Sequence, residues 1–183
     1  MIKIKRSILI WQLLGYTVTA ILGTLLHFIY EWSGHSFLVA PFSAVSESTW
    51  EHMKLFFFPA FLFAIFQSFF FKEFNNFWLI KLIGTLLGLF LIPVIFYTYN
   101  GAIQKSPDWL NIAIFFISAG ACYLFEGLLF KKNKPNSIGN TTPFIAIFCL
   151  IVFLFILFTF KTPKLRMFLD PIYDTYGIIN YSL

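Results

Sequence analysis

The chain has 183 residues, of which 59% are hydrophobic and 11% are charged, against roughly 25% charged residues in an average soluble domain. This composition disfavours a water-soluble fold, because too few charged residues remain to cover its surface. The formal net charge of +5 comes from basic residues in ones, twos and threes at the ends of apolar runs. We therefore expect membrane lipids as partners and no nucleic acid, which would need a basic face with interleaved aromatic residues; the sequence identifies no protein partner.

Five long charge-free stretches predict an all-α, polytopic membrane protein, a bundle of about five transmembrane helices in a single domain. With its flanking residues, each stretch can cross about 30 Å of hydrocarbon at 1.5 Å per residue. The helices are expected at about residues 7–30, 48–71, 78–99, 109–130 and 142–160, followed by a tail at 161–183.

The first predicted helix follows Lys3, Lys5 and Arg6, so the N-terminus resembles the basic and apolar opening of a secretory signal. We expect no cleavage, because the apolar stretch exceeds the roughly 7 to 15 residues of a signal peptide and lacks a convincing cleavage site. Tyr30 and Trp32 at the end of this helix are typical of anchors at the membrane interface.

The distribution of Lys and Arg predicts the orientation of a multi-pass protein in the cell membrane. Five crossings place eight basic residues on the side of the N-terminus and five on the other side. Because short loops rich in Lys and Arg stay in the cytoplasm, we expect a cytoplasmic N-terminus and an extracytoplasmic C-terminus.

Polar residues that a membrane helix does not need gather in the first connection and in the C-terminal tail. With an odd number of crossings, these two segments emerge on the same side of the membrane. All three histidines of the chain lie in or next to the first connection. The candidate ligands or catalytic groups on this side are His27, Glu31, His35, Glu47, Glu51, His52, Asp170 and Asp174.

His27 and Glu31 are four residues apart at the end of the first helix, so they project from the same helix face. His27 lies about one turn below the expected interface, where an ionisable group is a candidate for a functional site. The alternative is a histidine that forms a hydrogen bond to a neighbouring helix or reaches toward water.

The second helix begins with a capping box, in which Ser48 accepts from the Glu51 amide and the Glu51 side chain reaches back to the Ser48 amide. Glu47 and His52 then occupy the two positions that usually carry an apolar staple, so we predict that they contact each other. An imidazolium is disfavoured at the positive end of a helix, so His52 is expected to stay neutral.

These residues lead to a hypothesis about a site. Two histidines with one or two carboxylates would suit a divalent metal such as Zn, with an open position that activates water, although the spacing matches no catalytic metal motif such as HExxH. The tail from Asp170 to Tyr176 either folds over the site as a lid or remains a solvated tail anchored by tyrosines. The catalytic candidates are His27, Glu31, Glu47 and His52, and the metal candidates are His27, His52, Glu31, Glu51 and Asp170.

Three further features have structural interpretations. Cys122 and Cys149 are far from any CxxC spacing, and we expect them to be small packing residues. Gly84 and Gly88 form a small-xxx-small spacing typical of close helix packing. Glu126, near the end of the fourth helix, is expected to reach toward water or to pair with a neighbouring lysine, Lys131 or Lys132.

The first connection also carries a family resemblance. Three segments resemble the family of unknown function DUF6512, small membrane proteins of Gram-positive bacteria. They are the run from His27 to Gly34, then Phe42-Ser43, and then the core Glu-Ser-x-Trp-Glu-His-x-Lys at 47–54. The resemblance covers most of the chain and implies a membrane location but no biochemical activity. The sequence departs from it just before the core, where Ala44-Val45-Ser46 replaces an expected Pro-Val-Asn and no rigid turn is predicted.

Three functions are compatible with these observations. The first is a polar site on the extracytoplasmic face, metal-binding or not, that acts on a lipid-linked or other amphipathic substrate. The second is a non-enzymatic interaction or assembly protein, in which the same residues shape the connection and present Trp32 and Trp50 to a partner. The third is a small transporter, which the scarcity of ionisable residues in the apolar stretches disfavours. The sequence does not decide whether the protein is an enzyme.

Overall fold

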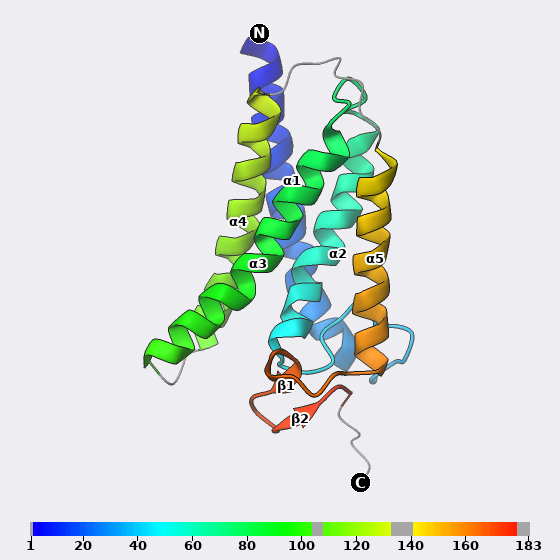
Figure 1. Cartoon of the computed structure of the whole chain (residues 1–183), viewed down its shortest axis with the longest axis vertical. Helices are drawn as coiled ribbons and strands as arrows, with labels where there is room; N and C mark the ends of the chain where they lie inside the picture. The colour runs from blue at the N-terminus through cyan, green and yellow to red at the C-terminus, as the bar shows by residue number, and fades with distance from the viewer. Residues whose placement is uncertain (1, 104–107, 133–140, 179–183) are drawn as a thin grey trace.

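The computed structural model describes residues 2–103, 108–132 and 141–178, and the predicted tail beyond residue 178 lies outside this part of the chain. Five long helices form an antiparallel bundle, in which the first helix begins at one end and the segment after the fifth helix lies at the other (Figure 1). They are α1 (Ile2–Trp32), α2 (Thr49–Ser68), α3 (Phe77–Ile103), α4 (Asp108–Lys132) and α5 (Thr142–Phe160). The prediction of an all-α bundle is confirmed.

Four of these helices are long and apolar enough to cross a membrane: Ser7–Trp32, Phe77–Ala102, Trp109–Lys132 and Thr142–Phe160. The remaining helix, α2, is less apolar than these four stretches because Glu51, His52 and Lys54 lie in its first two turns. It nevertheless runs through the bundle, and 13 of its 20 residues are buried. The protein is therefore a polytopic membrane protein in which α2 is a central helix.

Three helix ends lie three or more residues from the prediction. α3 continues to Ile103 rather than ending at residue 99, and the other two differences have identifiable reasons. α1 begins at Ile2, because Lys and Arg are good helix formers even where they end an apolar run. α2 ends at Ser68 rather than at residue 71. Its last turn tightens, since the carbonyl of Gln67 accepts the main-chain N–H groups of both Phe70 and Phe71.

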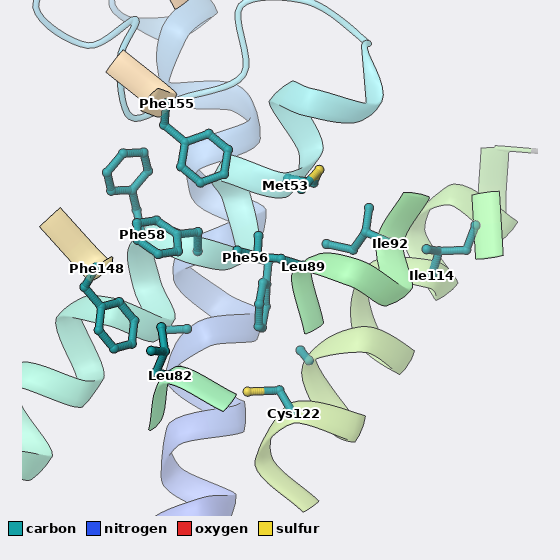
Figure 2. Packing of buried hydrophobic residues seen from close by; sticks show 13 residues of the cluster. Met53, Phe56, Phe58, Leu82, Leu89, Ile92, Ile114, Cys122, Phe148 and Phe155 are labelled. Atoms are coloured by element: carbon teal, nitrogen blue, oxygen red, sulfur yellow. The ribbon is translucent and has the colours of Figure 1, made fainter. Parts of the chain in front are cut away.

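Aromatic side chains from α2 and α5 pack with aliphatic side chains of α3 and α4 in the core (Figure 2). Phe57 is fully buried, and its ring centroid lies 5.2 Å from that of Phe155 in α5. Small residues allow the helices to approach, since a Cβ built on Gly88 would lie 2.4 Å from Cζ of Phe56. Cys122 packs in this core and Cys149 is exposed on α5, and neither forms a disulfide.

The segment after α5 folds back across one end of the bundle (Figure 1). A short 3-10 helix, η1 (Arg166–Phe168), leads into a hairpin of β1 (Leu169–Asp170) and β2 (Thr175–Tyr176). The antiparallel register pairs Leu169 with Tyr176 and Asp170 with Thr175. The two alternatives for the tail were a lid folded over the site and a solvated tail anchored by tyrosines. The structure supports the folded tail and places it beside the start of α2.

Candidate functional site

The first connection reaches α2 through a cap that the sequence predicted in part. Ser48 is the N-cap of α2, and its Oγ accepts the main-chain N–H of Glu51 at 3.4 Å. The second half of the predicted capping box is wrong. The Glu51 carboxylate instead accepts the main-chain N–H of Val45 at 3.0 Å and pairs with Lys54 at 2.6 Å.

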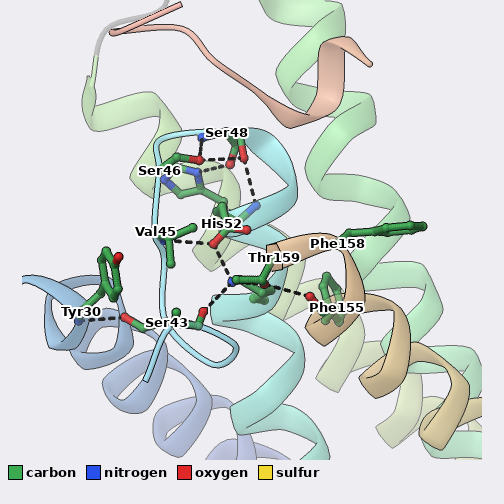
Figure 3. A network of polar contacts seen from close by, with 12 residues as sticks. Tyr30, Ser43, Val45, Ser46, Ser48, His52, Phe155, Phe158 and Thr159 are labelled. Carbon is green, nitrogen blue, oxygen red and sulfur yellow. Dashed lines mark hydrogen bonds and ion pairs between the residues drawn. The ribbon is translucent and has the colours of Figure 1, made fainter. Parts of the chain in front are cut away.

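Lys54 connects three parts of the fold, and Figure 3 shows the polar contacts around Thr159, one of its partners. Its Nζ lies 2.6 Å from the Glu51 carboxylate and donates to the carbonyl of Ala40 at 3.0 Å and to Oγ1 of Thr159 at 2.9 Å. The side chain is fully buried, and these three acceptors satisfy all three of its donors. The connection, α2 and α5 therefore meet at one ammonium group, and the Glu51 carboxylate is occupied there.

Ser43 anchors the same connection to the end of α1. Its Oγ accepts the main-chain N–H of Tyr30 at 3.0 Å and donates to the carbonyl of Leu26, so it bonds to the chain on both sides of His27. Hydrogen bonds of Ser46 and Ser48 follow along the chain. Short polar side chains therefore hold the turn into α2 around Ala44-Val45-Ser46.

Glu47 lies between two imidazole rings. Its carboxylate oxygens are 3.8 Å from Nε2 of His27 and 3.5 Å from Nε2 of His52, and the two rings lie 5.6 Å apart between centroids. These three residues are called the histidine–glutamate cluster below. Their side chains are 30%, 40% and 26% exposed in chain order, so the cluster is open at its surface. The predicted contact between Glu47 and His52 is confirmed.

Hydrogen bonds orient two members of the cluster. Nδ1 of His52 lies 3.0 Å from the carbonyl of Ser48, which can only accept, so Nδ1 carries a proton and Nε2 of the neutral ring is its basic atom. The main-chain N–H of Glu47 donates to Oδ2 of Asp170 at 2.9 Å. The helix cap positions one imidazole, and the C-terminal hairpin positions the carboxylate.

Packing holds the third member. The His27 ring lies edge-on to Phe28, with centroids 4.9 Å apart. Its Nδ1 is buried, with no hydrogen-bond partner among the described residues. His27 thus contributes an imidazole whose Nε2 faces Glu47 and whose ring lies beside that of His52.

The remaining candidates lie outside the cluster. Glu31 is exposed and forms neither a hydrogen bond nor an ion pair with His27 in the part of the chain that the structure describes. His35 is exposed, has a positive φ of 62°, and contacts the ring of Tyr30. Asp174 is exposed in the hairpin turn with a φ of 52°.

Asp170 has a positioning role. Its side chain is buried, and Oδ1 accepts the main-chain N–H groups of Ile172 and Tyr173 while Oδ2 accepts that of Glu47. Three donors therefore occupy this carboxylate. Within residues 2–103, 108–132 and 141–178, no three His, Cys, Asp or Glu side chains are placed to hold a metal ion together.

The sequence also missed a second buried ion pair. Glu126 of α4 lies 2.6 Å from Nζ of Lys81 in α3, and both side chains are buried. Its other oxygen accepts from Sγ of Cys122 at 3.5 Å. The predicted pairing of Glu126 with Lys131 or Lys132 is wrong, because Lys81 faces the bundle interior rather than a loop.

The two tryptophans proposed as partner contacts differ. Trp50 packs inward against Phe155, Phe158 and Phe168, with ring centroids 4.6, 5.5 and 4.8 Å away. Trp32 is 69% exposed and stacks on Phe28 at 5.6 Å. The structure therefore leaves Trp32 at the surface and places Trp50 in the packing between α2, α5 and η1.

Comparison with known proteins adds a family but no activity. The family of unknown function DUF6512 matches residues 1–178, which confirms the resemblance carried by the residues around Glu47. No curated protein and no solved structure matches the chain.

Proposed function

We propose a function for this chain, which belongs to the family of unknown function DUF6512, from the geometry of the histidine–glutamate cluster. The protein is an integral membrane protein whose cluster exchanges protons with the polar part of an amphipathic or lipid-linked substrate. One observation carries this proposal: the Glu47 carboxylate lies 3.8 Å and 3.5 Å from two imidazole Nε2 atoms at a partly exposed position.

The chemistry follows from the orientation of His52. Its Nδ1 proton is held by the Ser48 carbonyl, so Nε2 is the atom that accepts a proton from a substrate. Glu47, which lies beside this same nitrogen, stabilises the imidazolium that forms through its negative charge. His27 supplies a second imidazole on the other side of the carboxylate.

The surroundings of the cluster support a substrate that arrives through the membrane. The cluster lies at the end of a bundle with an apolar outer surface, and Trp32 at the end of α1 and Phe37 and Leu38 in the first connection are strongly exposed. Exposed aromatic and aliphatic side chains at a helix end are typical of the membrane interface. The basic residues of the sequence favour an extracytoplasmic position for this end and a cytoplasmic N-terminus.

The test uses the full chain in lipid nanodiscs. Purified protein is incubated with a total lipid extract of the source cells, and lipids are compared by mass spectrometry before and after. We expect wild-type protein to convert at least one lipid, and H52Q and E47Q to lower the rate roughly 100-fold or more. The matched control is H35N, which replaces an exposed histidine of the same connection and should keep the wild-type rate.

The outcome that contradicts the proposal is equally defined. Either no lipid is converted by wild-type protein, or H52Q and E47Q convert it as fast as H35N does. Zinc binding stays a separate prediction, tested by elemental analysis of the purified protein. Zn bound in stoichiometric amount by wild-type protein and lost in both H27Q and H52Q would support zinc binding. A protein without metal, whose stability is unchanged by a chelator, would contradict it.

A second candidate, a non-enzymatic interaction protein, is favoured by the exposure of the first connection. Trp32 is 69% and Leu38 is 83% exposed, and such side chains can serve as anchors in a protein partner. In this case W32A/L38A would lose a partner that crosslinking in cells captures with the wild-type chain, whereas H27Q/H52Q would retain it.

A further inference from the structure

A groove on the outer surface of the bundle lies between α1 and α4, at the end opposite the histidine–glutamate cluster. Its volume is about 240 Å³. Its walls include the side chains of Leu9, Leu13, Leu124 and Leu128, all of which are exposed on the lipid-facing surface. The groove is therefore apolar and open toward the membrane.

Glycines on α4 create the space. Gly120 and Gly127 both line the groove. A Cβ built on Gly120 would meet a single side chain, with Cε2 of Tyr16 at 3.8 Å, which is ordinary contact. A side chain at this position would therefore enter the groove without displacing the helices.

The length of the groove matches one leaflet of a bilayer. Its lining residues on α4 run from Gly120 to Lys131, which corresponds to about 16 Å at 1.5 Å per residue. Half of a hydrocarbon core of about 30 Å is about 15 Å. An acyl chain of one leaflet would thus fill the groove along its length.

Positive charge is concentrated where the groove reaches the end of the bundle. Lys131 lines the groove, and Lys132 is exposed next to it. The start of α1, whose sequence contains Lys3, Lys5 and Arg6, lies at the same end of the bundle as the end of α4 (Figure 1). Residues 2–13 and 120–132 contain one acidic residue, Glu126, which is buried against Lys81.

We propose that this groove binds one acyl chain of an anionic phospholipid, with the phosphate at Lys131. The apolar walls and the leaflet-length span suit the chain, and the basic end suits a net negative head group. A choline head group would find no free carboxylate among these residues. This lipid site is independent of the histidine–glutamate cluster and lies at the other end of the bundle.

The test measures lipid retention by native mass spectrometry of the full chain. The probes are palmitoyl-oleoyl phosphatidylglycerol and palmitoyl-oleoyl phosphatidylcholine in equal amounts. Wild-type protein should retain one phosphatidylglycerol in preference to phosphatidylcholine. K131Q should lower this preference about fivefold, since one basic residue near an anionic surface contributes about 1 kcal/mol, while K161Q, an exposed lysine at the other end, should leave it unchanged.

The groove itself is tested by filling it. G120L should lose the retained phosphatidylglycerol, and G101L should keep it, because Gly101 is a helical glycine of α3 with no atom within 4 Å of its built Cβ. The proposal is overturned if G120L retains the lipid like wild type, if K161Q acts like K131Q, or if wild type retains both lipids equally. K131Q changes an exposed side chain, so its result stands even if G120L fails to fold.

Discussion

The carboxylate of Asp170 accepts the main-chain N–H of Glu47 at 2.9 Å, across 123 residues of chain. The same carboxylate accepts two further N–H groups from Ile172 and Tyr173 in its own hairpin. One buried acid therefore joins the C-terminal hairpin to the segment that carries the central carboxylate of the histidine–glutamate cluster.

Replacing Asp170 should release this connection. D170N exchanges a charged acceptor for a neutral amide that can accept on one side only, and hydrogen bonds to charged groups contribute about 1.5–3 kcal/mol each. We expect a loss of at least about 1.5 kcal/mol in the free energy of unfolding and faster proteolysis after α5. D174N, in the same turn, is the control and should stay within about 0.5 kcal/mol of wild type, and an equal effect of both variants would contradict the assigned role.

Lys54 offers a sharper test of the buried connection. K54M keeps the volume of the side chain but leaves Glu51 buried without its ion-pair partner, which typically costs about 3–5 kcal/mol. The double variant E51Q/K54M should recover part of this loss, because no buried charge remains. Thermal unfolding in detergent measures both variants against K164M, which changes an exposed lysine, and a K54M protein as stable as K164M would show that the ion pair has no structural role.

Two glycines of the bundle should respond oppositely to alanine. A Cβ on Gly84 would lie 2.4 Å from Cγ of Glu126, so G84A forces α3 and α4 apart and should lower the free energy of unfolding by about 1–3 kcal/mol. A Cβ on Gly120 meets only Tyr16 at 3.8 Å. G120A should therefore be neutral or stabilising by about 0.5–1 kcal/mol, since alanine is the better helix former; the reverse order of the two variants would refute the packing described here.

Cysteine labelling tests the five passages through the bundle. In a C122A/C149A background, Phe37→Cys and Tyr173→Cys should react with an impermeant maleimide from one side of the membrane, and Lys72→Cys only from the other. All three positions are exposed, and the first two lie in the connection and in the hairpin that meet at the cluster. If the connection and the hairpin were labelled from opposite sides of the membrane, they could not meet at the histidine–glutamate cluster in the membrane-embedded protein.

Apolar run length and local spacing were enough to predict the helices and one contact of the site. A stretch such as 142–160 must span or be buried because it has no charge to place in water, whatever its neighbours are. The contact of Glu47 with His52 follows from the geometry of a single helix start, in which the N-cap Ser48 places both side chains on one side. Both inferences depend only on residues close together in the chain.

Contacts between distant segments escaped the sequence. Glu51 satisfies the rule of a capping box, yet its carboxylate binds Lys54 three residues later. Lys54 in turn bonds to Ala40 and Thr159, which lie 14 and 105 residues away in the chain. Glu126 pairs with Lys81 rather than with a neighbour in its own helix. The local pattern admits several partners for a charged side chain, and the partner within reach in the interior is the one that offsets the cost of burial.

Hydrophobicity along the chain thus specifies a bundle of membrane helices, because the cost of leaving apolar stretches in water is set segment by segment. Which polar side chains meet depends on helix rotation, tilt and the return of the tail, and those are set by the packing of all five helices together. For that reason His27 and Glu47 come together while Glu31, four residues from His27, does not join them.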